Sequence, residues 1–179
     1  MEKEALLETV PFGTLRFPID EGLCEEFPLS LEDGLRTVSL FIGEGVAEPR
    51  RQEAVTALLN AVPELCQRAK ERIVRDFEAD PVIAGYLQRR MDELGGAEDL
   101  FSLAIDFEAM DVMSPQKVFA AEMEVASVFL LPAGDGKVRC VVLFRHDPDL
   151  TREYLAARFE RDGELIDITT IREGGESDG

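Results

Sequence analysis

The chain has 179 residues, of which 37 are acidic and 19 are basic, so its formal net charge at pH 7 is −18. This length suffices for one domain with a hydrophobic core, and a hydrophobic content of 45% predicts a folded chain rather than a disordered one. A charge of this sign repels phosphates and anionic lipids, which argues against nucleic-acid and membrane partners. No apolar run is long enough to cross a bilayer and residues 1–10 do not resemble a signal peptide, so we expect a cytoplasmic protein.

The negative charge is unevenly distributed along the sequence. Residues 1–49 hold 11 acids and 3 bases, residues 50–94 hold 8 of each, and residues 95–179 hold 18 acids and 8 bases. The excess therefore falls on the segments that we expect to form strands, and the central helical segment is neutral. Such a field attracts a basic protein surface, although a simple role in solubility explains it as well.

Residues 1–10 are expected to form a frayed helix or an arm. A first strand is predicted over residues 11–17, because aromatic and aliphatic residues lie between two prolines. Residues 27–31 and 35–42 flank a Glu-Asp-Gly turn and predict a β-hairpin. The proline within residues 27–31 predicts an edge strand.

Residues 50–94 predict the helices around which the fold is organised. Pro63 interrupts the first helix and predicts a kink or a break near Val62. A second helix is expected to begin at Pro81, with Asp80 as its cap, and to end at Gly95. The first helix has apolar residues spaced three or four apart, which is the spacing of one helical face: Val55, Leu58, Leu59, Val62, Leu65, Cys66, Ala69, Ile73 and Phe77.

The second half of the chain predicts mostly strands. Residues 98–105 fit either a short helix or a strand, because their apolar residues suit both periods. The remaining segments favour strands that tight turns connect, and the acid-rich tail over residues 173–179 is expected to be disordered. The predicted strands cover residues 107–113, 119–131, 138–145, 154–160 and 165–171.

These elements predict a single α+β domain over residues 1–172. We expect an antiparallel sheet of about six or seven strands, with a kinked central helix and a second helix packed on one face. The order of the strands within residues 98–131 stays open.

The candidates for chemistry are few. His146 is the only histidine, and with Asp147 and Asp149 it forms a candidate polar site for a metal ion or for a general base. One histidine and two acids lack the further ligands that a metal site needs, so a solvent-exposed turn is the simpler interpretation.

Cysteines and glycine-rich segments add no site. The three cysteines are scattered without zinc-ligand spacing and are expected to be reduced, buried thiols: Cys24, Cys66 and Cys140. No glycine-rich phosphate loop or calcium loop is present. The sequence therefore predicts no catalytic residue, no metal and no cofactor.

Two runs of residues resemble a family of small acidic bacterial domains of unknown function. The run Leu150-Thr151-Arg152-Glu153-Tyr154-Leu155, followed by Phe159, Asp162-Gly163-Glu164-Leu165 and Ile168, is similar to the closing strand pair of that family. Phe12-Gly13-Thr14-Leu15 is similar to its opening "Phe-Gly-x-Leu" strand. The chain departs from the family between Asp106 and Val128. The resemblance implies a single-domain, cytoplasmic bacterial protein, some relatives of which occur beside toxin–immunity genes, and it assigns no active site.

We therefore expect a non-enzymatic binding protein that uses an acidic surface to engage a basic protein partner, as an immunity-like or regulatory factor. Two alternatives stay open. One is a small hydrolase or metal-dependent enzyme that uses carboxylates and His146. The other is a homo-oligomer that buries an edge strand such as residues 27–31. The expected acidic interaction surface consists of Glu25, Glu26, Glu32, Asp33, Glu122 and Glu124.

Overall fold

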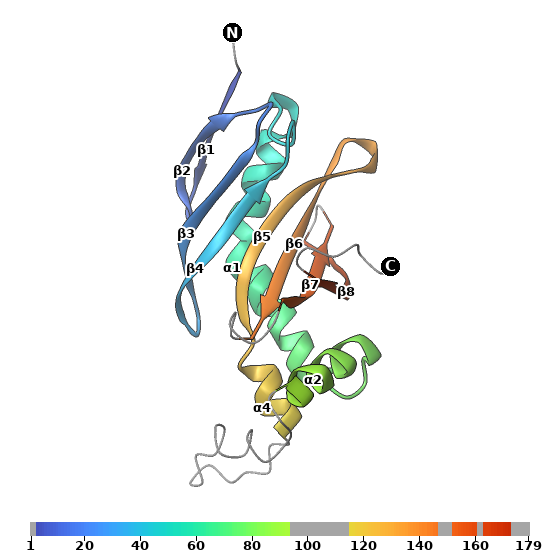
Figure 1. Cartoon of the computed structure of the whole chain (residues 1–179). Coiled ribbons are helices and arrows are strands. Elements are labelled where there is room, and N and C mark those ends of the chain that lie inside the picture. Colours follow the sequence, from blue (N-terminus) through green and yellow to red (C-terminus); the bar gives the residue numbers. More distant parts are fainter. Residues whose placement is uncertain (1–2, 94–114, 147–151, 161–162, 173–179) are drawn as a thin grey trace. The chain divides into compact units, whose positions relative to one another are not determined.

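The computed structural model describes residues 3–93, 115–146, 152–160 and 163–172 (Figure 1). These residues form an α+β fold with eight strands and three α-helices. The strands are β1 (Glu4–Thr9), β2 (Gly13–Pro18), β3 (Leu23–Leu31), β4 (Gly34–Ile42), β5 (Glu124–Ala133), β6 (Lys137–Arg145), β7 (Glu153–Phe159) and β8 (Leu165–Arg172). The helices are α1 (Gln52–Arg75), α2 (Pro81–Glu93) and α4 (Pro115–Ala121), and short 3-10 turns cover Pro49–Arg51 and Gly134–Gly136.

The strands form two sheets. β1 and β2 pair with each other in a two-stranded sheet, and the other six pair in the order β3-β4-β5-β6-β7-β8. β3 and β4 are antiparallel, as predicted, whereas β4 and β5 are parallel. The prediction of a wholly antiparallel sheet is therefore wrong at this pair. The reason is that the helical segment between β4 and β5 returns the chain to the same end of the sheet, which is the connection that parallel strands need.

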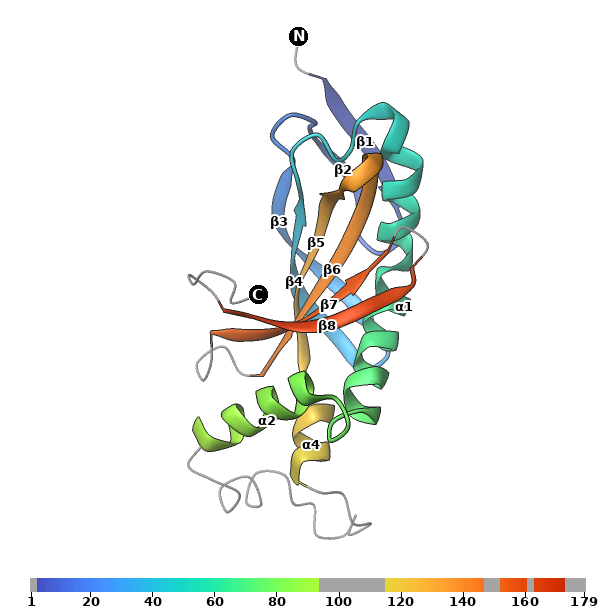
Figure 2. The same cartoon turned by 90° about the vertical axis from the view of Figure 1, so that its right-hand side faces the viewer.

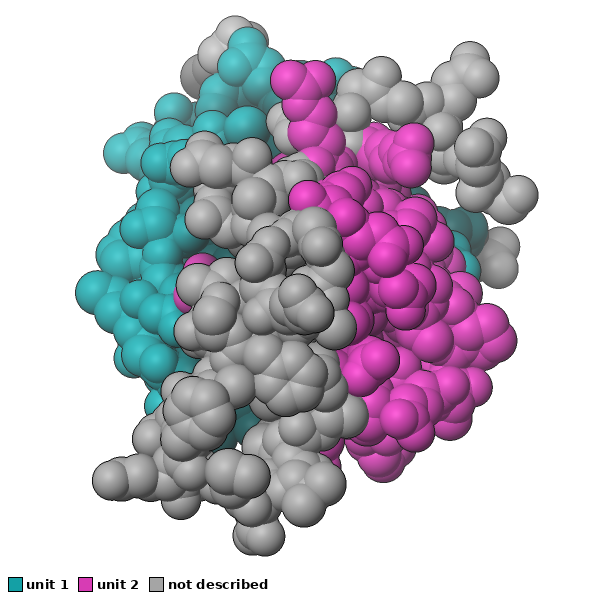
Figure 3. Space-filling model, turned by 60° about the horizontal axis from the view of Figure 1, so that its bottom comes forward, with its two compact units in different colours: residues 1–69, 125–143, 157–167 teal, residues 70–124, 144–156, 168–179 magenta. Residues whose placement is uncertain are grey.

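By its internal contacts the chain divides into two compact units (Figure 3). Unit 1 comprises residues 1–69, 125–143 and 157–167, and unit 2 comprises residues 70–124, 144–156 and 168–179. The boundaries fall inside α1, β5, β6, β7 and β8. The prediction of one domain over residues 1–172 stays a prediction.

In unit 1, the first part of α1 covers one face of β4, β5 and β6 (Figures 1 and 2). The predicted apolar stripe is buried from Val55 to Ala69 in this unit, and Ile73, which belongs to unit 2, is also buried. Burial of this stripe stabilises the fold, since each large aliphatic side chain that is fully buried contributes roughly 1.5–3 kcal/mol. α1 continues through Pro63. The helix loses one hydrogen-bond donor there, and the buried residues on both sides keep it intact.

Several predicted elements are confirmed. The hairpin of β3 and β4 surrounds the predicted turn, and β3 is the terminal strand of its sheet. α2 begins at Pro81, where the Val82 N–H donates to Asp80 Oδ1 at 2.9 Å. β6, β7 and β8 follow the predicted segments to within two residues.

Two further predictions, each about a single element, are wrong, and three lie outside the described residues. Residues 4–9 form β1 and not a helix or an arm, and residues 119–121 belong to α4 and not to a strand. In β1 the buried and exposed residues alternate with a period of two, so the pairing with β2 decides its structure. The predictions for residues 98–105, 107–113 and 173–179 fall outside the described part of the chain.

Candidate functional site

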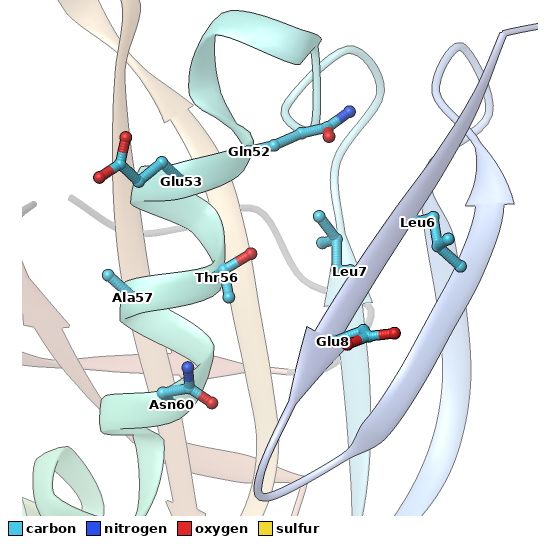
Figure 4. Close-up of a pocket in the computed structure, with 8 residues that line it drawn as sticks. All are labelled: Leu6, Leu7, Glu8, Gln52, Glu53, Thr56, Ala57 and Asn60. Atoms are coloured by element: carbon cyan, nitrogen blue, oxygen red, sulfur yellow. The ribbon is translucent and has the colours of Figure 1, made fainter.

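Among the described residues of unit 1, an open groove lies between β1 and the first turns of α1. Its volume is about 390 Å³. In Figure 4, Gln52, Thr56 and Asn60 project from α1 toward β1, and Leu7 projects from β1 toward the helix. The groove is lined by Leu6, Leu7, Glu8, Gln52, Glu53, Thr56, Ala57 and Asn60.

The backbone of β1 has one paired edge and one outer edge. Next to the strand, the Ile19 N–H donates to the Lys3 carbonyl at 2.9 Å. In an antiparallel pair, the residues that bond to the partner strand alternate with residues that do not. The odd-numbered residues of β1 therefore bond to β2, and the even-numbered residues Glu4, Leu6 and Glu8 direct their N–H and C=O groups to the outer edge.

Two further contacts agree with this alternation. The N–H of Val10, another even-numbered residue, donates to Asn60 Oδ1 on α1 at 2.9 Å. Pro18, which has no N–H, is the β2 partner of Glu4 and so occupies a position that needs no ladder donor. The outer edge of β1 therefore faces α1, and the side-chain amide of Asn60 already accepts one of its backbone hydrogen bonds.

The groove has a buried apolar base and acidic rims. Leu7 is buried, whereas the Leu6 side chain is 59% exposed. Glu8 on β1 and Glu53 on α1 are both exposed, and neither has a cation within ion-pair distance among the described residues. Two uncompensated carboxylates beside an apolar base suit a ligand that carries both apolar and positively charged groups.

The predicted acidic surface is only partly brought together. Glu25, Glu26 and Glu32 are exposed on β3 and its hairpin turn, and Asp33 in the same turn lies 3.7 Å from the Arg36 guanidinium. Neighbouring strand residues point to opposite faces, so Glu25 and Glu26 do not share one surface. The exposed residues Glu122 and Glu124 belong to unit 2, separate from the β3 group in unit 1.

The candidate polar site at His146 differs from the predicted exposed turn. His146 is only 8% exposed, and its ring stacks on Tyr86 with the ring centroids 6.0 Å apart. Asp147 and Asp149 lie outside the described residues. Within the described part of the chain, no three His, Cys, Asp or Glu residues are grouped so that they could hold a metal ion. His146 therefore packs inside unit 2, against Tyr86 of α2.

A buried ionic cluster lies beside this ring pair, and the sequence did not indicate it. Glu153 on β7 accepts hydrogen bonds from Arg89 Nη2 at 2.6 Å and from Arg90 Nη2 at 2.7 Å. The side chains of Glu153 and Arg90 are only 6% and 4% exposed. The Tyr86 hydroxyl donates to the Glu153 carbonyl at 3.1 Å, which attaches α2 to β7 a third time.

The two arginines decide the protonation of this carboxylate. Burial alone would raise the pKa of Glu153, but the hydrogen bond from Arg89 and the positive charges of Arg89 and Arg90 outweigh it and lower the pKa. Burial raises the pKa of the Tyr86 hydroxyl to about 12, so this group stays neutral. The adjacent pair Arg89 and Arg90 is the only signal for this cluster in the sequence, and basic residues near the end of a helix are ordinarily explained by the helix dipole.

The cysteines provide no activated thiol among the buried positions. Cys66 and Cys140 are buried in unit 1, as predicted, whereas Cys24 is exposed on β3 and corrects the prediction of a buried residue. Burial, with a smaller contribution from the charge of Asp33, raises the pKa of Cys66 to about 12. A thiol with so high a pKa is protonated and is a poor nucleophile at neutral pH.

The groove residues were missed at the sequence level because residues 1–10 were not recognised as a strand. The available signal was the alternation of Glu4, Leu6 and Glu8 with Ala5 and Leu7 before a turn. Two adjacent leucines obscured this period of two. The helix wall was also missed, because its polar residues resemble an ordinary exposed helix face.

Comparisons with protein-family models, curated proteins and solved structures give no match to this chain. The resemblance to small acidic bacterial domains stays a prediction. None of the described helices is both long enough and apolar enough to cross a membrane.

Proposed function

We propose that this chain is a non-enzymatic binding protein that engages a basic protein partner through the exposed carboxylates of unit 1. The observation that carries the proposal is an excess of exposed acids without any cation partner among the described residues. These acids occur on β1, β3, the start of α1 and the turns beside them. They are Glu8, Asp20, Glu21, Glu25, Glu26, Glu32, Glu44 and Glu53.

The basic residues of unit 1 are mostly engaged by other acids of the same unit. Six arginines form ion pairs there, for example Arg16 with Glu4 at 2.7 Å and Arg68 with Glu64 at 2.6 Å. The remaining acids therefore produce a field that the unit does not itself neutralise. Such a field accelerates encounter with a basic partner and weakens as salt is added. An immunity-like or regulatory role in the bacterial cytoplasm is the form of this function that we favour.

A pull-down from the native cytosol tests the proposal. The immobilised chain should retain a basic protein at about 50 mM salt and release it at about 300 mM, because the Debye length shortens. A variant with Glu25→Gln, Glu26→Gln and Glu32→Gln should retain less of it. The matched control is Glu4→Gln, whose carboxylate is already paired with Arg16. The absence of any salt-sensitive partner would contradict the proposal.

Self-association through an edge strand is the second candidate, since β3 is the terminal strand of its sheet. However, β3 carries Pro28 together with the exposed like charges Glu25 and Glu26. Proline and like charges on an edge strand oppose pairing with an identical strand. Sizing chromatography decides between the candidates: an elution volume that corresponds to a monomer supports the binding protein, and a stable dimer supports self-association.

A further inference from the structure

The outer edge of β1 differs from the edge of β3 in how well it is protected. β3 carries Pro28 within the strand, whereas residues 3–10 contain no proline. The backbone groups of Leu6 and Glu8 point to the outer edge of β1, beside the groove. A strand edge with donors and acceptors in register is a template for an additional strand. The groove therefore combines an open strand edge with a wall of polar side chains.

From this juxtaposition we infer that the groove between β1 and α1 binds an extended segment of the basic partner by strand addition to β1. The inference rests on the proposed function and names the site and the form of the partner. The N–H and C=O groups of Leu6 and Glu8 provide the hydrogen bonds of the new ladder. Asn60 ends the ladder, because its side chain already accepts the hydrogen bond from the Val10 N–H. Main-chain bonds of this kind provide affinity without sequence specificity.

The side chains around the ladder define which segment fits. In an added strand, alternate side chains point to opposite faces. One set points to the inner side, where Leu7 and Ala57 line the groove and where small apolar side chains fit. The other set lies on the outer face beside Glu8, where lysine or arginine side chains gain electrostatic attraction. The segment is therefore expected to alternate basic and apolar residues over about six positions, the span of β1 at about 3.3 Å a residue.

Glu53 lines the helix side of the groove, with its carboxylate directed away from β1 (Figure 4), and its replacement allows a charge test with a matched control. Glu53→Lys places a positive charge beside the groove. Glu26→Lys makes the same change in charge on β3, where the residue is also exposed, belongs to unit 1 and has no ion pair among the described residues. If carboxylates act only as a diffuse field, the two variants weaken binding equally. If the groove is the site, Glu53→Lys has the larger effect.

The probe is a fluorescein-labelled peptide of about eight residues in which lysine and valine alternate. Two control peptides alternate glutamate with valine and lysine with proline. Fluorescence anisotropy should show that the lysine–valine peptide binds at about 50 mM salt and that the glutamate–valine peptide does not. The lysine–proline peptide has the same charge but lacks half of the ladder donors, so its binding should be at least about tenfold weaker.

With the lysine–valine peptide, Glu53→Lys should weaken binding at least about tenfold and Glu26→Lys at most about twofold. Thermal unfolding by circular dichroism should show that both variants fold. Amide hydrogen exchange gives a second readout, since saturation with the peptide should slow exchange of the Leu6 and Glu8 amides at least about tenfold.

Each contrary outcome has a distinct meaning. Equal losses in Glu53→Lys and Glu26→Lys overturn the groove but leave the diffuse acidic surface of the proposed function intact. Peptide binding that leaves the Leu6 and Glu8 amides unprotected also overturns strand addition. A dimer that dissociates with Glu53→Lys shows that a second copy occupies this edge, which overturns the heterologous partner. If no salt-sensitive ligand binds in this test or in the pull-down, the inference and the proposed function both fail.

Discussion

Glu8 and Glu153 are both glutamates on β-strands, and they illustrate two uses of the same side chain. Glu153 on β7 is 6% exposed and bonds to Arg89 and Arg90 of α2. Glu8 on β1 is exposed beside the groove and has no cation partner among the described residues. The carboxylate of Glu153 is hydrogen-bonded to arginine side chains in place of water, so the stability of unit 2 depends on its negative charge. The carboxylate of Glu8 is solvated, so its charge is available to a partner.

The largest effect is expected when Glu153 is replaced. Glu153→Gln keeps the shape of the side chain but removes the charge opposite two arginines, one of which is buried. An uncompensated buried cation is costly, so the free energy of unfolding should fall by about 3 kcal/mol at pH 7. Urea unfolding followed by circular dichroism measures the loss.

The matched control for Glu153→Gln is Glu93→Gln. Glu93 also pairs with Arg90 Nη2, at 2.9 Å, but its side chain is 45% exposed. Its replacement should lower the free energy of unfolding by less than about 1 kcal/mol. Equal losses in the two variants would show that burial does not distinguish the two carboxylates.

The native chain and the Glu153→Gln variant should differ in how their stability depends on pH. The folded state lowers the pKa of Glu153, whereas an unfolded glutamate titrates near about 4.3. The stabilisation is therefore complete above about pH 4.3 and is lost as the pH falls through the lower, folded-state pKa. The stability gap between the native chain and Glu153→Gln should be constant from pH 7 down to about pH 5 and then shrink. Urea unfolding over a series of pH values checks this, and a gap that widens in acid would refute it.

An ion pair of intermediate exposure should give an intermediate effect. Arg158 Nε donates to Asp167 Oδ1 at 2.6 Å, and Arg158 Nη2 also donates to Asp167 Oδ2. Both side chains are 37% exposed. Asp167→Asn should therefore lower the free energy of unfolding by about 1 kcal/mol. A double-mutant cycle with Arg158→Gln should show a coupling of similar size. A coupling near zero would show that this cross-strand pair contributes no more to stability than a solvated carboxylate such as Glu8.

The parts of the fold that depend on local patterns could be predicted from the sequence. The apolar stripe of α1, the cap of α2 at Asp80 and the turn between β3 and β4 each depend on residues close together in the chain. β1 could not be predicted in this way. Its structure comes from pairing with β2, and its adjacent leucines fit a helix as well as a strand.

Contacts between residues far apart in the chain could not be predicted from such local patterns. The parallel pairing of β4 with β5 joins segments separated by all three described helices. The bond between Arg90 and Glu153 spans 63 residues. Of the predicted site residues, Glu25, Glu26 and Glu32 are exposed as expected, because charged residues in turns and edge strands are usually solvated. The groove was not predictable, since it depends on which edge of β1 faces α1.

The smallest change in stability is expected at Glu8. Glu8→Gln makes the same chemical change as Glu153→Gln, also on a strand, but removes a solvated charge from a unit with excess negative charge. The free energy of unfolding should change by less than about 0.5 kcal/mol, and at low salt it should rise rather than fall because like charges repel one another. Affinity for the lysine–valine peptide should nevertheless fall about threefold, because one carboxylate beside the added strand is lost. Urea unfolding and anisotropy on the same preparation measure both quantities. A loss of stability near that of Glu153→Gln would mean that the Glu8 carboxylate stabilises the fold, which would contradict its assignment to partner binding.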